Sequence, residues 1–219
     1  MLIKTLPVGQ LETNCYVVTD ETSMDCAVID PGDESNAILN YLEEHKMTCR
    51  AILITHGHWD HTGAANAIVE ETGADLYIHQ LDTTSDPMEA RYKYLASDNT
   101  RFYDEGDEIH IGSLVFRVMF TPGHSPGGVT LVCEDAVFCG DTLFRGSCGR
   151  TDLPGGDINE ELRSILRICK LPGEYDIYPG HMDSTTLERE RNFNYYCRQA
   201  LGMSEEIKTT RKTGGLFLP

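Results

Sequence analysis

Apolar and polar residues follow two different spacings along the first half of the chain, and these spacings alternate. Short apolar runs rich in β-branched residues predict strands at 2–6, 15–19, 26–29, 51–55 and 76–79. Between them, apolar side chains recur at helical spacing at about 35–46 and 63–72, which predicts amphipathic helices. The first half is therefore expected to alternate strands and helices.

The second half of the chain is richer in strand patterns. Apolar runs predict strands at 108–111, 114–120, 129–133, 136–139 and 175–178, and helices are predicted at about 158–170 and 184–201. Residues 83–104 are polar and irregular, which favours a loop or a short helix over a site. Two β-rich halves with helices outside favour an α+β fold, an αββα four-layer sandwich of two mixed β-sheets packed face to face. No linker is evident, so one domain over 1–219 is expected.

Composition and charge limit which molecules the protein is expected to bind and where in the cell it is expected to act. A formal net charge of −17 argues against binding to nucleic acid or to an anionic membrane, because phosphate binding needs clustered basic residues. No secretory signal or membrane-length apolar run is present, which favours a cytoplasmic protein. The eight cysteines are scattered without a C-x-x-C pair, so buried reduced thiols are expected.

The densest chemistry lies at 56–61, in the order H-x-H-x-D-H. His56, His58, Asp60 and His61 offer three imidazoles and one carboxylate, which are common ligands of zinc and iron. The first two point to one side of an extended backbone and the last two toward another position, so two metals are inferred. The alternative is that Asp60 caps a helix opening at residue 62 or 63 and the histidines are solvated loop residues.

Three more candidate ligands each follow an apolar run and a glycine-bearing turn, as the 56–61 segment follows its own strand. They are His124, Asp141 and His181. Side chains at strand ends can converge on one edge of a sheet, where a rigid core holds them in place. Structural roles are expected instead for His45, His79 and His110, and for Cys139 and Cys148.

Together these segments resemble the metallo-β-lactamase-fold superfamily, and within it the glyoxalase II-like (hydroxyacylglutathione hydrolase-like) enzymes. The resemblance covers about residues 1–200 and implies the αββα fold. It implies two divalent metal ions, with zinc favoured and iron or manganese as alternatives. One metal would be held by His56, His58 and His124, the other by Asp60, His61 and His181, with Asp141 bridging. Flavodiiron-type members usually carry Glu at the position of His58, which disfavours that branch.

Two adjacent divalent cations can lower the pKa of a shared water and polarise a carbonyl, which favours a hydrolase whose nucleophile is a metal-bound hydroxide. A thiolate can leave without a dedicated general acid, because the pKa of a free thiol is about 8.5. An amide or alkyl ester would need a proton, for example through Asp60 as a shuttle. The sequence therefore favours a small thioester, such as an S-2-hydroxyacylglutathione, as the substrate.

Residues 144–152 are predicted to form a substrate wall. Arg150 lies where glyoxalase II enzymes have a basic residue for the glutathione carboxylate, and Arg145 is a second candidate. Alternatively, Arg150 pairs with Asp152 or Asp157 and braces the loop. Only 38 residues follow His181, too few for a separate glutathione-binding helical C-terminal domain, so the thiol stays open. Basic residues at 208–212 could add contacts or be solvated.

Other functions compete with this one. The closest is a mononuclear iron persulfide (sulfur) dioxygenase of the same fold, which the chain resembles around 148–152 and which would use His56, His124 and Asp141. A lactonase or another superfamily hydrolase ranks third, and charge disfavours ribonucleases. Seven candidate ligands argue against a purely structural site, which normally has four. The oligomeric state stays open.

Overall fold

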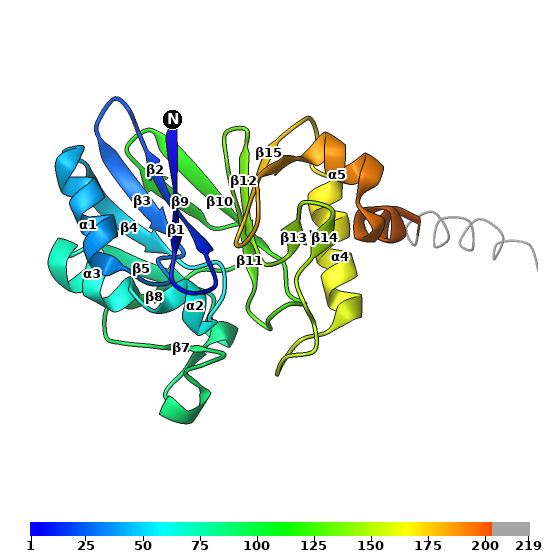
Figure 1. Cartoon of the computed structure of the whole chain (residues 1–219), viewed down its shortest axis with the longest axis horizontal. Helices are drawn as coiled ribbons and strands as arrows, with labels where there is room; N and C mark the ends of the chain where they lie inside the picture. Colours follow the sequence, from blue (N-terminus) through cyan, green and yellow to red (C-terminus); the bar gives the residue numbers. More distant parts are fainter. Residues whose placement is uncertain (203–219) are drawn as a thin grey trace, which may run out of the picture.

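Two six-stranded sheets form the centre of the computed structural model, which describes residues 1–202 (Figure 1). The first sheet has the order β1 (Leu2–Val8), β2 (Thr13–Thr19), β3 (Asp25–Ile29), β4 (Thr48–Leu53), β5 (Asp75–Ile78) and β8 (Thr100–Phe102). The second has the order β16 (Thr185–Thr186), β15 (Asp176–Pro179), β12 (Ala136–Gly140), β11 (Val129–Cys133), β10 (Leu114–Phe120) and β9 (Glu108–Ile111). Both sheets are mixed: β3, β4, β5 and β8 pair in parallel in one, and β12 pairs with β15 in parallel in the other.

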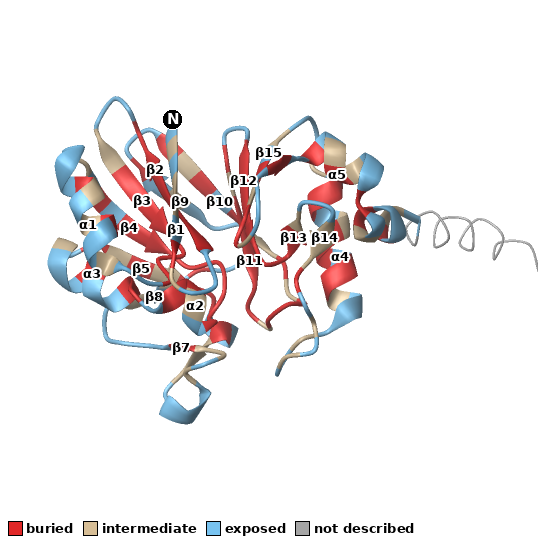
Figure 2. Ribbon diagram, in the orientation of Figure 1, coloured by how far each residue is buried: buried red, intermediate tan, exposed pale blue. Residues whose placement is uncertain are grey.

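The sheets pack face to face, and helices cover their outer faces. Residues of both sheets, among them Tyr16, Val18, Phe116 and Phe138, form one buried cluster between them. On the outer face of the first sheet lie α1 (Ser35–Glu44) and α3 (Ala65–Thr72), and beside the second lie α4 (Ile158–Cys169) and α5 (Leu187–Phe193) (Figure 1). Buried residues therefore concentrate in the strands and on the inner sides of the helices (Figure 2). The predicted αββα sandwich is confirmed.

Strand β2 contributes side chains to two hydrophobic clusters, one on each face of the first sheet. Side chains alternate along a strand, so Tyr16 and Val18 enter the cluster between the sheets while Cys15 and Val17 enter the cluster under α1 and α3. All seven residues of β2 are buried, which places it inside the sandwich. All eight cysteines are free and all but Cys148 are buried, in agreement with the expected reduced thiols.

Two predicted helices begin or end elsewhere. The helix expected at 63–72 is α3, which starts two residues later than predicted, and a short helix that was not predicted, α2 (Trp59–Thr62), precedes it. The helix expected at 184–201 starts at Leu187 and breaks at Asn194, whose backbone is extended. The Asn194 carboxamide oxygen accepts the amide hydrogen of Tyr196 at 2.8 Å and so caps a new helical segment at 195–202.

The irregular segment 83–104 is only partly a loop. It holds the short 3-10 turn η2 (Pro87–Glu89), a two-strand pair of β6 (Thr83–Thr84) and β7 (Tyr94–Leu95), and then β8. Strand β8 extends the first sheet beside β5, which the sequence pattern did not predict because its three residues are too few for a visible alternation. Within 1–202, no helix is long and apolar enough to cross a membrane. The basic residues at 208–212 lie outside the described residues.

Candidate metal centre

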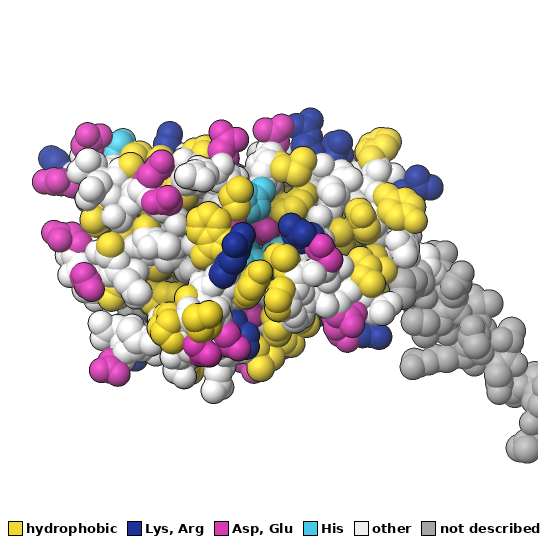
Figure 3. All heavy atoms as spheres, turned by 60° about the horizontal axis from the view of Figure 1, so that its bottom comes forward, with side chains coloured by type: hydrophobic (Ala, Val, Ile, Leu, Met, Phe, Trp, Pro, Cys, Tyr) yellow, Lys and Arg dark blue, Asp and Glu magenta, His cyan; other side chains and the backbone are white. Residues whose placement is uncertain are grey.

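All seven predicted ligands converge at one edge of the sandwich. His56 and His58 lie in the loop after β4, Asp60 and His61 on α2, and the others after strands: His124 after β10, Asp141 after β12 and His181 after β15. Five of them are buried, and only Asp60 and His181 are partly exposed. In the space-filling view, histidine and acidic atoms are seen at the bottom of a hollow (Figure 3). The strand-end rule therefore identified residues that do meet.

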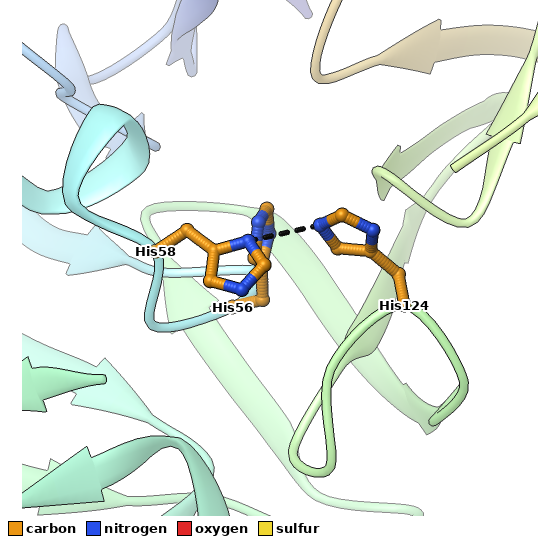
Figure 4. Close-up of side chains that lie close together, drawn as sticks. All are labelled: His56, His58 and His124. Atoms are coloured by element: carbon orange, nitrogen blue, oxygen red, sulfur yellow. Dashed lines mark hydrogen bonds between the residues drawn. The ribbon is translucent and has the colours of Figure 1, made fainter. Parts of the chain in front are cut away.

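The ligand atoms form three groups, in each of which all atoms lie within 4.8 Å of one another. These groups are His56, His58 and His124; Asp60, His61 and His181; and His56, His61 and Asp141. Figure 4 shows His58 and His124 reaching toward each other from two loops, with 2.9 Å between His58 Nδ1 and His124 Nε2. Two neighbouring cation positions fit this arrangement better than one.

Asp141 lies between the two positions. Its Oδ2 is 3.4 Å from His124 Nε2 and 3.6 Å from His181 Nε2, and its Oδ1 is 3.5 Å from His61 Nε2. Asp60 belongs to the second position only, with Oδ2 at 3.2 Å from His181 Nε2. One carboxylate thus faces ligands of both groups, as a bridging ligand must.

Several atoms of the centre have no hydrogen-bond partner. His56 Nε2 and Asp141 Oδ1 are buried and unpaired, which costs free energy unless a bound group satisfies them. Burial and the neighbouring histidines lower the pKa of His56 well below its usual range and that of His58 to about 4, so both are neutral, as metal ligands must be. A set of imidazole nitrogens and carboxylate oxygens suits zinc, iron or manganese. The residues present therefore fit two divalent cations.

Neighbouring groups orient the rings from outside the centre. Asp30, which is buried, accepts hydrogen bonds from His61 Nδ1 at 3.1 Å and from the Thr55 amide at 2.7 Å. The ring nitrogen Nδ1 of His124 bonds the carbonyl of Arg150 at 2.7 Å, and that of His181 bonds the carbonyl of Leu11 at 3.1 Å. Each contact leaves Nε2 facing the centre, which is the usual way that a protein fixes the tautomer of a metal-binding histidine.

Asp82 holds two ligand loops together. It is completely buried, and its carboxylate accepts hydrogen bonds from the Gly57 amide at 2.8 Å, the Gly127 amide at 2.6 Å and the Ser125 hydroxyl at 2.7 Å. Gly57 lies in the 56–61 segment and the other two follow His124. Asp82 thus fixes the distance between loops that are far apart in the sequence.

Sequence reasoning missed both of these acids. Asp30 follows the apolar strand β3, so the strand-end rule that identified the candidate ligands could have identified it, although the Pro31 and Gly32 that follow it are typical turn residues. Asp82 had no such signal, because it lies at the end of a short 3-10 turn and its three partners are 25, 43 and 45 residues away in the sequence. The alternative of Asp60 as a helix cap is wrong, because His58 occupies the N-cap position of α2.

A glycine makes room for the centre. A Cβ added at Gly180 would lie 2.3 Å from Asp141 Oδ1 and 2.6 Å from His61 Cε1, which is too close for any side chain. The turn before His181 therefore brings backbone, rather than a side chain, against two ligands.

A cavity of about 570 Å³ opens over the ligands. Its wall includes hydrophobic and basic side chains from five parts of the chain: Leu11, Trp59, Arg91, Tyr92, Phe144, Cys148, Arg150, Leu153 and Met182. The predicted segment 144–152 thus contributes to it, but residues 91 and 92 come from the irregular segment 83–104.

The predicted arginines have different surroundings. Arg150 lines the cavity, and its guanidinium donates two hydrogen bonds to Asp152, at 2.7 and 2.8 Å, so the pair expected as the alternative is present. The guanidinium holds the pKa of Asp152 at about 2. Arg145 pairs with Asp183 at 2.7 Å and is not among the residues that line the cavity. The basic residue missed by sequence reasoning is Arg91.

The remaining histidines and cysteines lie outside the ligand groups. His45 caps the end of α1 and His79 stacks on Phe120, as ordinary structural residues do. The Cys139 thiol donates to the carbonyl of Leu143 at 3.1 Å and packs in the core. Cys148 lines the cavity but belongs to none of the ligand groups among the described residues, and burial raises the pKa of its thiol to about 12.

Comparison with known proteins identifies one family. The family described as the metallo-beta-lactamase superfamily matches residues 8–181. Among curated relatives, hydroxyacylglutathione hydrolase GloC of Haemophilus influenzae is 32% identical over 207 residues, which cover 89% of this chain and 97% of that protein.

Solved structures of the same fold belong to proteins with different names. The BLEG-1 B3 metallo-beta-lactamase superposes with a TM-score of 0.80 at 33% identity, covering 90% of this chain and 99% of that one. TTHA1623 in a di-iron-bound form has a TM-score of 0.77 at 36% identity, with 88% and 99% covered. ETHE1 from Myxococcus xanthus has a TM-score of 0.77 at 28% identity, with 89% and 84% covered.

Proposed function

The chain belongs to the metallo-beta-lactamase superfamily, whose members are generally metal-dependent hydrolases, and we propose that it is a dinuclear hydrolase of a small thioester. The observation that carries this proposal is the shared centre: two groups of three ligands with Asp141 facing both. The likeness to GloC favours an S-2-hydroxyacylglutathione or a related thiol ester as the substrate. The likeness to a di-iron form of TTHA1623 supports two metals in a chain of this size.

The residues divide between the two cations as their geometry suggests. His56, His58 and His124 would hold one, and Asp60, His61 and His181 the other, with Asp141 between them. Zinc is the first expectation, with iron or manganese as alternatives. When bound, two such cations supply Lewis acidity that lowers the pKa of water toward neutrality and polarises a carbonyl.

The protein side of the reaction consists of positioning and proton transfer. The wall residues Trp59, Phe144 and Met182 would exclude water from the acyl group and orient its carbonyl over the centre. Asp60 lines the cavity and is ionised in spite of burial, because its neighbours His181 and His61 hold its pKa below the usual range. Its carboxylate can therefore orient an attacking water and receive its proton transiently, although so low a pKa makes it a weak base.

A thioester suits a cavity wall that has, among residues 1–202, no carboxylic acid other than the candidate ligands Asp60 and Asp141 to protonate a departing group. The high pKa of Cys148 keeps its thiol protonated and excludes it as a nucleophile. A thiolate leaves unprotonated because its pKa is about 8.5, whereas an amine or alkoxide would need a proton donor. The proposal therefore places a thiol ester before a β-lactam or a lactone, in spite of the likeness to BLEG-1.

The second candidate is a persulfide dioxygenase with one iron. The likeness to ETHE1 favours it, and His56, His124 and Asp141 would then hold the metal. That reaction needs one redox-active cation, so the contact between Asp60 and His181 would not serve to hold a second cation.

Metal analysis with two assays separates the candidates. Protein purified aerobically and anaerobically is analysed for zinc, iron and manganese, then assayed for thiol release from S-D-lactoylglutathione and for oxygen uptake with glutathione persulfide. We expect two metals per chain and thiol release. One iron per chain with oxygen uptake and no thiol release would refute the hydrolase.

Two ligand variants sharpen the result. His61→Ala and His181→Ala should each reduce thioester hydrolysis at least 100-fold, since each removes a ligand of the second cation. A one-iron dioxygenase should lose much less activity. Arg101→Gln is the control, because Arg101 on β8 forms a surface ion pair with Asp75 on β5, outside the cavity wall.

We also propose that the protein acts in the cytoplasm on a small molecule and does not bind nucleic acid or membranes. The net charge of −17 supports this, because it repels polyanions.

A further inference from the structure

Arg91 lies on the cavity wall and is held there by its main chain. Its carbonyl accepts the amide hydrogen of Trp59 at 3.3 Å, which ties it to the segment that carries the ligands. The next two residues, Tyr92 and Lys93, both donate amide hydrogens to the carbonyl of Glu89, at 2.8 and 3.0 Å. This turn therefore fixes where the Arg91 side chain starts, at the rim of the centre.

The segment around Arg91 packs directly on the ligand loop. A Cβ added at Gly57 would lie 2.9 Å from the amide nitrogen of Tyr94 and 3.0 Å from the Cα of Lys93. Gly57 separates His56 from His58, so no layer of side chains intervenes between the 91–94 segment and the metal ligands. Residue 91 is therefore part of the site and not of a distant loop.

No acidic side chain among residues 1–202 compensates the charge of Arg91. Two arginines line the cavity, and Arg150 is already paired with Asp152 through two hydrogen bonds. Within residues 1–202, no ion pair is found for the Arg91 guanidinium, although the whole chain has a net charge of −17. Basic side chains border the hollow at whose floor the histidines are seen (Figure 3). The Arg91 guanidinium, which pairs with none of the described carboxylates, is therefore available to a carboxylate of a bound molecule.

We propose that Arg91 binds a carboxylate of the substrate and so restricts the enzyme to thioesters that carry one. This inference rests on the proposed thioesterase function. A guanidinium matches a carboxylate with two parallel hydrogen bonds, which gives both affinity and orientation. The cavity of about 570 Å³ has room for a carboxylate-bearing group beyond the acyl group itself.

The neighbouring tryptophan provides a second contact and a probe. Trp59 is the only tryptophan of the chain, lines the same cavity and is 40% exposed. Its indole can cover the apolar part of the thiol or acyl chain while Arg91 holds the charged end. Occupation of the cavity should therefore change the intrinsic fluorescence.

The test compares thioesters that differ only in charge. S-lactoyl-3-mercaptopropionate is compared with its primary amide, to test a carboxylate on the thiol side. S-succinyl-N-acetylcysteamine is compared with its terminal amide, to test one on the acyl side. We expect the metal-loaded protein to prefer the acid over the amide at least tenfold in kcat/KM in one of the two pairs, and to lose much of that preference in 0.5 M NaCl.

The variants assign that preference to Arg91. Arg91→Gln should raise KM for the preferred acid about tenfold with little change in kcat, and should affect the amide less than twofold. Arg91→Lys should restore part of the preference, and Arg101→Gln, with its surface pair to Asp75, should behave as the wild type.

Binding gives a readout that does not depend on turnover. S-methylglutathione, which has two carboxylates and no thioester, is titrated against Trp59 fluorescence in the metal-loaded protein. Arg91→Gln should weaken its binding about tenfold, whereas Arg101→Gln should not.

The outcomes separate this inference from the proposed function. If the wild type hydrolyses acid and amide equally in both pairs, the hydrolase stands and the role of Arg91 is refuted. An acid preference that survives in Arg91→Gln also refutes it and points to Arg150. If no thioester is hydrolysed, the proposed function fails and Arg91 as a thioester anchor fails with it.

Discussion

Replacing Asp82 with asparagine is expected to loosen the metal centre without removing any of its ligands. One carboxylate oxygen of Asp82 accepts two hydrogen bonds, from Gly57 and Ser125, and the other accepts one, from Gly127. Asparagine can keep the oxygen on the side with two donors, but its amide nitrogen then faces the amide hydrogen of Gly127. Two donors meet in a site that is completely buried.

The cost follows from that contact. Loss of one hydrogen bond to a charged acceptor costs about 1.5–3 kcal/mol, and a buried donor left without a partner costs about 1–3 kcal/mol. Removing the buried charge recovers part of this free energy, because burial raises the pKa of Asp82 and therefore disfavours its ionised form. We expect a net loss of about 3 kcal/mol in the free energy of unfolding, a large share of the 5–15 kcal/mol typical of a domain.

Urea unfolding of the metal-free protein measures this loss, and a competition titration with a chelator measures metal affinity. We expect affinity to fall 10- to 100-fold, because the loops of His56 and His124 lose their common support. Asp86→Asn is the matched control: Asp86 is exposed and caps η2 through the Met88 amide, a role that asparagine fills equally well. An unchanged urea midpoint in Asp82→Asn would show that the three hydrogen bonds do not support the fold. A lower midpoint with unchanged metal affinity would show that Asp82 supports the fold but not the centre.

Three further outcomes are expected. Gly180→Ala should reduce the metal content measured by plasma emission from two ions to one or none, because its Cβ would meet Asp141 and His61, whereas Gly202→Ala, where a Cβ meets nothing, should keep two. Burial raises the pKa of Glu161 to about 9, so the folded protein keeps this proton at pH values where the unfolded chain has released it. Between pH 6 and 8, Glu161 should therefore lower the free energy of unfolding of the wild type by about 1.4 kcal/mol for each unit that the pH rises. Glu161→Gln should lose that slope in urea titrations across this range, and an identical slope in both proteins would contradict the assignment. Zinc at 100 times its Kd should stabilise the protein by about 2.7 kcal/mol per site, seen as a higher thermal midpoint that a chelator reverses; equal midpoints with and without zinc would argue against a preformed centre.

The fold was predictable because its strands are long enough to show their pattern. The strands from β9 to β12 are apolar runs of four to seven residues, and each was predicted within one residue of its observed bounds. Strand β8 was not, because its three residues are partly or largely exposed and gain their order from pairing with β5. The break at Asn194 was not predictable either. The same carboxamide that accepts the capping hydrogen bond also donates to the carbonyls of Phe144 and Ser147, which are about 50 residues away in the sequence.

The clustering of the candidate ligands was predictable for a topological reason. A residue that follows an apolar strand must lie at an edge of the sheet, and neighbouring strands bring such residues together, so His124, Asp141 and His181 could be grouped before their distances were known. Asp30 obeys the same rule and was passed over because its sequence also suits a turn. Asp82 obeys no local rule, since its role depends on where two separate loops meet.

The residues that choose the substrate differ in kind from those that hold the metals. Ligands need fixed distances, so they come from strand ends and glycine turns, which leave periodic traces in the sequence. A wall residue needs only to reach the cavity, and Arg91 does so from a polar, irregular segment whose position is set by the packing of its backbone on Gly57. Relatives as different in name as a B3 metallo-beta-lactamase and a hydroxyacylglutathione hydrolase can therefore be built on one fold, because the wall can change while the strand ends stay in place. Exchanging the 83–97 segment for that of GloC should then alter the preference between acid and amide thioesters while the metal content stays at two; a changed metal content would show that wall and centre are not separable in this way.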